Sequence, residues 1–174
     1  MPGLFRLVFN PGGAARIQRG TRGNYYQLPG GARLEVWRQP VWCCGCRTFT
    51  EGEVISEIDD IDRMIAQHKQ ERGSAYRQHL HRTRNRERQW ALAIRLADLE
   101  LRRAWREQRV GPPRCLECGC GELIPLRRGE DIPNPNGPGT VRLEWLGMCC
   151  VPPREYIYSA EGEFLAGSTE APAW

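Results

Sequence analysis

The sequence lacks the patterns that mark secreted proteins, membrane proteins and several enzyme classes. Residues 1–13 contain no apolar core long enough for a signal peptide, and no stretch approaches the length of a membrane span. The motifs HExxH, GxSxG and GxxxxGK[ST] do not occur. We therefore expect a cytoplasmic protein with no membrane partner, and a binding or structural role rather than an enzyme.

Lysine is almost absent, because 24 of the 25 basic residues are arginine and Lys69 is the exception. Guanidinium groups pair with phosphates and carboxylates through two parallel hydrogen bonds, and they stack on flat rings. The formal net charge of +4 is small. The position of the arginines should therefore matter more than their number.

Eight cysteines are present, and four of them form two pairs with CxxC spacing: Cys43 with Cys46, and Cys115 with Cys118. Two thiolates separated by two residues can bind one ion from the same side, and a second pair completes a tetrahedral four-sulfur site. Such sites favour zinc. Gly119, directly after the second pair, permits the backbone conformation that turns amides toward the sulfurs.

Disulfides are the competing interpretation of an even cysteine count. Cys43 and Cys44 are adjacent in sequence, which is awkward for disulfide geometry, and CxxC spacing is more typical of metal sites in cytosolic chains. Neither ferredoxin spacing occurs, which argues against an iron–sulfur cluster. We expect one zinc ion, and a second ion using further ligands stays open; these would be Cys44, Cys120, Cys149 and Cys150.

Short apolar or alternating segments on both sides of the cysteine pairs predict strands. The expected strands are residues 4–9, 25–28, 33–38, 122–126, 140–146, 154–158 and 164–165, whereas 14–23 and 131–139 read as loops. Together they predict a small antiparallel base that resembles a zinc ribbon in a general way.

The segment between the cysteine pairs predicts helix. Thr50 to Glu53 has the form of a capping box, and the acidic residues that follow suit the positive end of a helix. Those acidic residues could alternatively form a divalent-metal site or a general-base site. Apolar stripes follow at Val54, Ile58, Ile61 and Ile65, and again at Trp90, Ile94, Ala97 and Leu101.

Three arrangements of this helical segment are open: one continuous helix, a hairpin turning at Gly73-Ser74, or a hairpin turning near residue 81. If the two cysteine pairs share an ion, the insert must return to its starting point, which favours the turn near residue 81. That turn places Ile61 opposite Leu101 and Ile65 opposite Ala97, so apolar positions meet.

The expected tip of this hairpin is rich in arginine: Arg77, Arg82, Arg84, Arg86 and Arg88. Such a tip could bind a nucleic-acid backbone or an acidic protein surface, or it could be an inert solvated face. His79 and His81 lie nearby, but alternate residues of a helix point to different sides and suit one ion poorly.

The sequence thus predicts an α+β protein in which a long, coiled-coil-like helical hairpin is inserted between two cysteine turns of a metal-stapled β base. The expected segments are 1–52 (N-terminal β), 53–110 (hairpin), 111–166 (C-terminal β) and 167–174 (tail). The first function hypothesis is a zinc-stabilised accessory protein that presents the hairpin to nucleic acid. The second is a protein-assembly component: an adaptor, an inhibitor or immunity protein, or a phage-type structural subunit. A mononuclear metal enzyme is the third, and an oligomer or larger assembly stays open.

Overall fold

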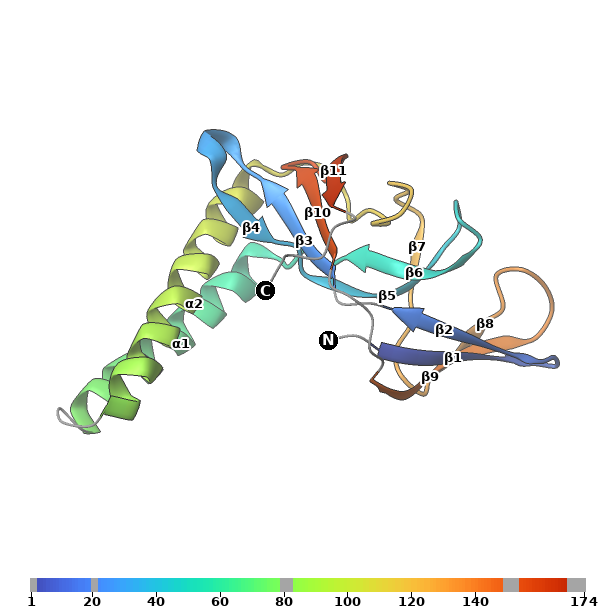
Figure 1. Ribbon diagram of the computed structural model, residues 1–174, viewed down its shortest axis with the longest axis horizontal. Coiled ribbons are helices and arrows are strands. Elements are labelled where there is room, and N and C mark those ends of the chain that lie inside the picture. The colour runs from blue at the N-terminus through green and yellow to red at the C-terminus, as the bar shows by residue number, and fades with distance from the viewer. Residues whose placement is uncertain (1–2, 20–21, 79–82, 149–153, 169–174) are drawn as a thin grey trace. The chain divides into compact units, whose positions relative to one another are not determined.

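The computed structural model describes residues 3–19, 22–78, 83–148 and 154–168 (Figure 1). Within these ranges the chain forms eleven strands in three sheets and two α-helices, so the expectation of a mixed α+β protein is confirmed. The helices are α1 (Ile58–Gln78) and α2 (Thr83–Gln108), with a short 3-10 helix at Pro29–Gly31. The strands are β1 (Gly3–Asn10), β2 (Ala14–Arg19), β3 (Arg22–Gln27), β4 (Arg33–Glu35), β5 (Arg38–Cys43), β6 (Thr48–Glu53), β7 (Leu123–Pro125), β8 (Asp131–Pro133), β9 (Thr140–Met148), β10 (Arg154–Ser159) and β11 (Phe164–Ser168).

The contacts divide the chain into two compact units. Residues 1–54 and 111–174 form one unit, which holds all the described strands and is called the β unit below. Residues 55–110 form the other, which is called the hairpin. Each unit therefore has its own internal packing.

The β unit contains three sheets with the strand orders β2-β1-β9-β8, β11-β10-β3-β4 and β6-β5-β7. All pairings are antiparallel except the one between β3 and β10, which is parallel. The prediction of a wholly antiparallel base is therefore wrong at this pairing. Alternation of polar and apolar residues is the same in both orientations, so it could not reveal the parallel pair.

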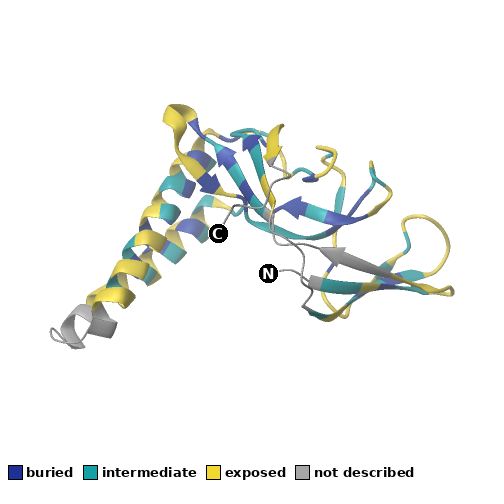
Figure 2. Ribbon diagram, viewed as in Figure 1, coloured by how far each residue is buried: buried dark blue, intermediate teal, exposed yellow. Residues whose placement is uncertain are grey.

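The main core of the β unit lies between the first and third sheets. Leu7 and Leu143 face each other across β1 and β9, and they pack with Trp42 and Phe49 of the third sheet. Leu126, Val141 and these four residues are all buried. Figure 2 colours the buried parts of the chain dark blue. Burial of each large apolar side chain contributes about 1.5–3 kcal/mol.

A second buried region contains polar side chains that are hydrogen bonded. The Tyr26 hydroxyl donates to Oε1 of Glu53 at 2.9 Å, and the backbone N–H of Arg114 donates to Oε2 at 2.9 Å. The Tyr158 hydroxyl donates to the carbonyl of Leu116 at 3.0 Å. Buried polar groups need such partners, so these bonds connect the β3–β10 sheet to the chain around Cys115.

Three local predictions in the β unit are wrong. Residues 14–19, expected to be a loop, form β2, and residues 131–133 form the short strand β8. Thr50 and Glu53, expected to cap a helix, lie in β6, where Thr50 pairs with Val41 and Glu53 with Arg38. The backbone N–H of Glu53, which the Thr50 side chain would accept in a capping box, donates instead to the carbonyl of Arg114 at 2.9 Å. The helix begins instead at Ile58, with Asp59 and Asp60 in its first turn.

The hairpin consists of α1 and α2, which pack against each other (Figure 1). Three ion pairs show the relative direction of the two helices. They join Glu57 to Arg106 at 3.6 Å, Asp62 to Arg103 at 2.6 Å, and Lys69 to Glu100 at 3.5 Å. Residue numbers that rise along α1 pair with numbers that fall along α2, so the helices are antiparallel. Gly73 lies within α1, which excludes a turn at that glycine, and residues 79–82 between the helices lie outside the described part of the chain.

The apolar seam of the hairpin agrees with the prediction on α1 but not on α2. Ile61 and Ile65 are buried as expected. On α2, however, Trp90 is 70% exposed and Ile94 is 48% exposed. The buried apolar residues of α2 are Leu92, Leu96, Leu99 and Trp105. The prediction that this stripe packs against α1 is therefore wrong. Trp90 and Ile94 instead form an apolar stripe that faces solvent.

Candidate metal centre

Two tight turns hold the cysteine pairs. Cys43 ends β5, and the chain turns through residues 44–47 into β6. In the second turn, the N–H of Gly119 donates to the carbonyl of Cys115 at 2.9 Å, and the N–H of Cys115 donates to the carbonyl of Cys120 at 2.8 Å. Gly119 has a φ of 74°, the left-handed conformation expected of it from the sequence.

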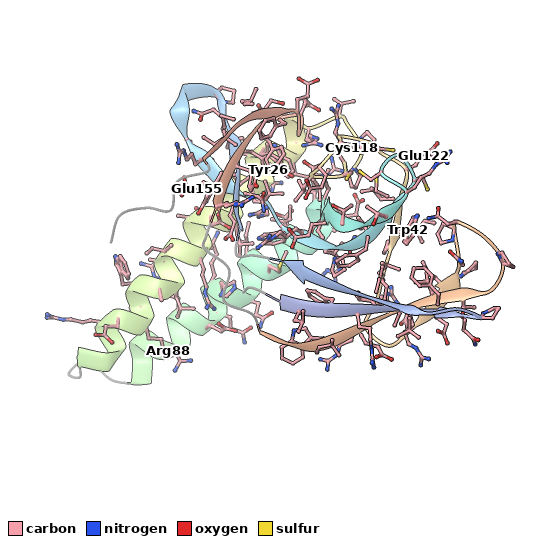
Figure 3. All side chains as sticks on the ribbon, turned by 45° about the vertical axis from the view of Figure 1, so that its right-hand side comes forward. Tyr26, Trp42, Arg88, Cys118, Glu122 and Glu155 are labelled. Carbon is pink, nitrogen blue, oxygen red and sulfur yellow. The ribbon has the colours of Figure 1, made fainter. Side chains whose placement is uncertain are left out.

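Backbone pairing joins the two turns, although they are far apart in sequence. Cys43 of β5 pairs with Leu123 of β7, and the N–H of Cys44 donates to the carbonyl of Glu122 at 3.1 Å. Gly52 forms an antiparallel bridge with Cys115. Figure 3 labels Cys118 and Glu122 in this region, where sulfur atoms gather. The sheet therefore positions the second turn beside the first.

The sulfur atoms of Cys43, Cys46, Cys115 and Cys118 all lie within 4.8 Å of one another. The Cys43–Cys118 sulfur separation is 3.5 Å, and the Cys46–Cys115 separation is 3.9 Å. A tetrahedral ion with metal–sulfur bonds of about 2.3 Å separates its sulfurs by about 3.8 Å. Both separations are longer than the sulfur–sulfur bond of about 2.05 Å in a disulfide, and they are compatible with a shared metal ion. The four cysteines whose spacing predicted one site are brought together.

The surroundings of the sulfurs shape their ionisation. Burial raises the pKa of the Cys43 thiol from 9.0 to about 12, and burial together with hydrogen bonds from the other thiols raises the pKa of Cys46. Burial opposes ionisation of Cys118, but hydrogen bonds from the Cys120 backbone and the neighbouring thiols outweigh it and lower the pKa. At neutral pH a bound metal ion must therefore displace protons from Cys43 and Cys46.

The first turn also requires a glycine at position 45, which was not predicted from the sequence. A Cβ atom added at Gly45 would lie 3.0 Å from the Cβ of Cys120 and 3.2 Å from its sulfur. Only glycine fits this close approach without displacing the second turn. Gly45 stands directly before Cys46, inside the first CxxC pair. A glycine at this position is the feature of the sequence that could have indicated the close approach.

The other four cysteines, which were possible further metal ligands, do not belong to the described cluster. Cys44 and Cys120 are free and lie outside the four-sulfur cluster, while Cys149 and Cys150 lie outside the described residues. Among the described residues, no second cluster of three or more histidine, cysteine or acidic side chains could hold a metal ion. The acidic residues at the start of the hairpin instead bind arginines: Asp62 binds Arg103, and Asp60 binds Arg63.

Only part of the predicted arginine tip can be described. Arg86 and Arg88 are exposed on α2, and Figure 3 labels Arg88 near one end of the hairpin. The side chains of Arg77 and Arg84, together with Arg82 and the histidine pair His79 and His81, lie outside the described residues.

Comparisons with models of protein families, with curated proteins and with solved structures found no match to this chain. None of the helices in the described ranges is long and apolar enough to cross a membrane. The functional proposal below therefore rests on the residues of this chain.

Proposed function

We propose that this chain is a non-catalytic, zinc-stabilised accessory protein that presents an arginine-rich helical hairpin to nucleic acid. The observation that carries the proposal is the uneven distribution of charge between the two units. The β unit, with its zinc-ribbon-like cysteine turns, serves as the base, and the coiled-coil-like hairpin serves as the recognition element.

Zinc is the metal that best suits the base. Four thiolates form a closed, soft donor set, and zinc prefers such sets with tetrahedral geometry. Catalytic zinc sites usually keep one position for water or substrate, whereas four cysteine sulfurs within 4.8 Å supply all four positions. The six described cysteines are free, which suits the reducing cytoplasm that we propose as its location.

All of the net charge resides in the hairpin. The β unit contains twelve basic and twelve acidic residues, whereas residues 55–110 contain thirteen basic and nine acidic ones. Within the hairpin, residues 69–95 hold eight basic and two acidic residues. The acidic residues gather at the other end, at Glu57, Asp59, Asp60 and Asp62. The hairpin thus has one strongly basic end.

A basic end of this kind suits a polyanion. Each arginine that contacts a phosphate releases condensed counterions, and arginine pairs with phosphate through two hydrogen bonds. Arg86 and Arg88 are exposed, and no ion pair between described residues involves either of them. Their positive charge is therefore available to a partner.

The test removes charge from the tip. The triple substitution Arg82→Gln, Arg84→Gln and Arg86→Gln should weaken binding to duplex DNA or RNA of arbitrary sequence. It should also reduce the salt dependence by about one unit of slope for each lost phosphate contact. Melting temperature and metal content should stay unchanged.

A matched control removes the same charge from the β unit at exposed positions, with Arg33→Gln, Arg127→Gln and Arg154→Gln. This control should bind nucleic acid nearly as well as the unmodified chain. Equal losses in the two triple variants would show that net charge alone governs binding. An unchanged salt slope in the tip variant would contradict a nucleic-acid role for the hairpin.

A second candidate function, a protein-assembly component such as an adaptor, an inhibitor or immunity protein, or a phage-type structural subunit, is favoured by the apolar stripe of α2. Trp90 and Ile94 are exposed and lie four residues apart, so they share a face of the helix. Exposed aromatic side chains of this kind frequently anchor protein interfaces. Trp90→Ser should then abolish one specific protein complex and leave nucleic-acid binding unchanged, as pull-down and nucleic-acid titration would show.

A further inference from the structure

A cavity of about 340 Å³ lies on the β unit, and none of its lining residues belongs to the four-sulfur cluster. Its volume is at the small end of the range of about 300–1,000 Å³ that is usual for ligand pockets. The lining residues are Phe5, Pro40, Leu126, Arg128, Leu143 and Trp145. Five of these six are apolar, and Arg128 supplies the charge.

The cavity forms where the apolar face of the β1–β9 sheet extends beyond the part that is buried in the core. Phe5 pairs with Trp145 across β1 and β9, and two residues further along Leu7 pairs with Leu143. Residues two apart in a strand share a face, so all four lie on the same side of the sheet. Leu7 and Leu143 are buried in the core, but Phe5 is half-buried and Trp145 is 44% exposed. The aromatic end of this face is therefore open to a ligand.

Arg128 is held over this open end. Its guanidinium carbon lies 5.1 Å from the centroid of the Trp145 ring. The backbone is fixed beside β9, because the N–H of Gly129 donates to the carbonyl of Leu143 at 3.1 Å. Stacking on a ring uses the flat face of a guanidinium and leaves the N–H groups at its edges free to donate.

No ion pair between described residues involves Arg128. Its neighbour Arg127 pairs with Glu130 at 3.8 Å, and Asp131 pairs with Arg142 at 3.5 Å. The acidic residues close in sequence are thus already paired with other arginines. Arg128 is a fixed cation that stands beside an apolar cavity and has N–H donors to offer.

We infer that this cavity binds a small aromatic carboxylate. The rings of Phe5 and Trp145 provide walls for a flat apolar group, and the edge of the Arg128 guanidinium matches a carboxylate fork. The single positive charge favours a monoanion, because a doubly charged phosphate would bring an unpaired charge to an apolar cavity. This site is independent of the hairpin and of the nucleic-acid proposal.

The experiment titrates the full-length, metal-loaded chain with naphthylacetate and with its neutral amide, naphthylacetamide. Calorimetry measures affinity, and the indole N–H signal of Trp145, assigned with Trp145→Phe, reports the location by NMR. The carboxylate should bind about tenfold more tightly than the amide, because it gains a charge-assisted hydrogen bond. Arg128→Gln should remove that preference.

Arg127→Gln is the matched control, since it removes the same charge one residue away, and it should keep the full preference. Trp145→Ala should weaken binding of naphthylacetate by about tenfold or more. Trp145→Phe keeps an aromatic wall, so it should bind naphthylacetate nearly as well as the unmodified chain does. Equal affinity for acid and amide would overturn the inference. It would also be overturned if no binding occurred, or if Arg127→Gln and Arg128→Gln had equal effects.

Discussion

The β unit and the hairpin are held together in different ways. In the β unit, strands far apart in sequence pair with each other, as β1 does with β9 and β3 with β10. The sulfurs of Cys43 and Cys118 meet across 75 residues. In the hairpin, two helices that follow each other in the chain pack through a local seam and surface ion pairs. The β unit therefore depends on long-range closure, which a metal ion can enforce, and the hairpin does not.

The largest expected effect tests this dependence. Cys46→Ser should release the metal and unfold the β unit, because apparent free energies of structural zinc binding are about 10–16 kcal/mol and whole domains are stable by only about 5–15 kcal/mol. The metal-to-protein ratio and the near-ultraviolet circular dichroism would record both losses. The helical signal at 222 nm should fall much less.

Cys44→Ser is the control for this substitution, since Cys44 lies outside the four-sulfur cluster. It should keep both the metal and the melting temperature. The comparison between the two units would break down if Cys46→Ser, or a strong chelator, left the melting of the β unit unchanged.

A smaller effect is expected in the seam of the hairpin. Leu96→Ala should reduce the free energy of unfolding by about 2–4 kcal/mol, because a buried side chain is lost and a cavity remains. Ile94→Ala, two residues away and 48% exposed, should cost less than about 1 kcal/mol. Thermal melting followed at 222 nm distinguishes them. A larger cost for Ile94→Ala than for Leu96→Ala would show that the predicted α2 stripe, and not the Leu96 face, packs in the seam.

The smallest of the three effects concerns a buried hydrogen bond of the β unit that does not involve the cysteines. Tyr26→Phe removes one of the donors to the buried carboxylate of Glu53 and should cost about 1–3 kcal/mol. Tyr25→Phe, at a half-buried neighbouring position, should cost less. Urea denaturation of the metal-loaded protein measures both. Identical costs would show that the bond to Glu53 contributes nothing beyond the packing of a tyrosine.

The sequence predicted the features that depend on local patterns. The CxxC spacing indicated which four cysteines come together, and the glycine after the second pair adopts the expected conformation. Two antiparallel helices were also expected, although the face of α2 was not. Residues 90, 94, 97 and 101 and residues 92, 96 and 99 both satisfy a helical period, and only the packing of α1 selects between them.

Features that depend on distant partners could not be predicted in this way. Thr50 to Glu53 carries a valid local capping signal, but pairing of β6 with β5 outweighs it. The parallel pairing of β3 with β10 joins segments on opposite sides of the hairpin in sequence. Glu53 looked like a residue of a helix start, and its buried bonds to Tyr26 and Arg114 became visible only in the fold.

The backbone bonds on either side of the hairpin have a consequence for how this protein can vary. The N–H of Glu53 donates to the carbonyl of Arg114 at 2.9 Å, and the N–H of Leu116 donates to the carbonyl of Glu51 at 3.0 Å. The β unit thus closes upon itself just before and just after the hairpin, and closure depends only weakly on the length of the segment between. Insertion or deletion of whole helical turns in both arms would change the reach of the hairpin in steps of about 5.4 Å. The four-sulfur cluster would keep its register throughout, so the length of the hairpin can change without a change in the β unit.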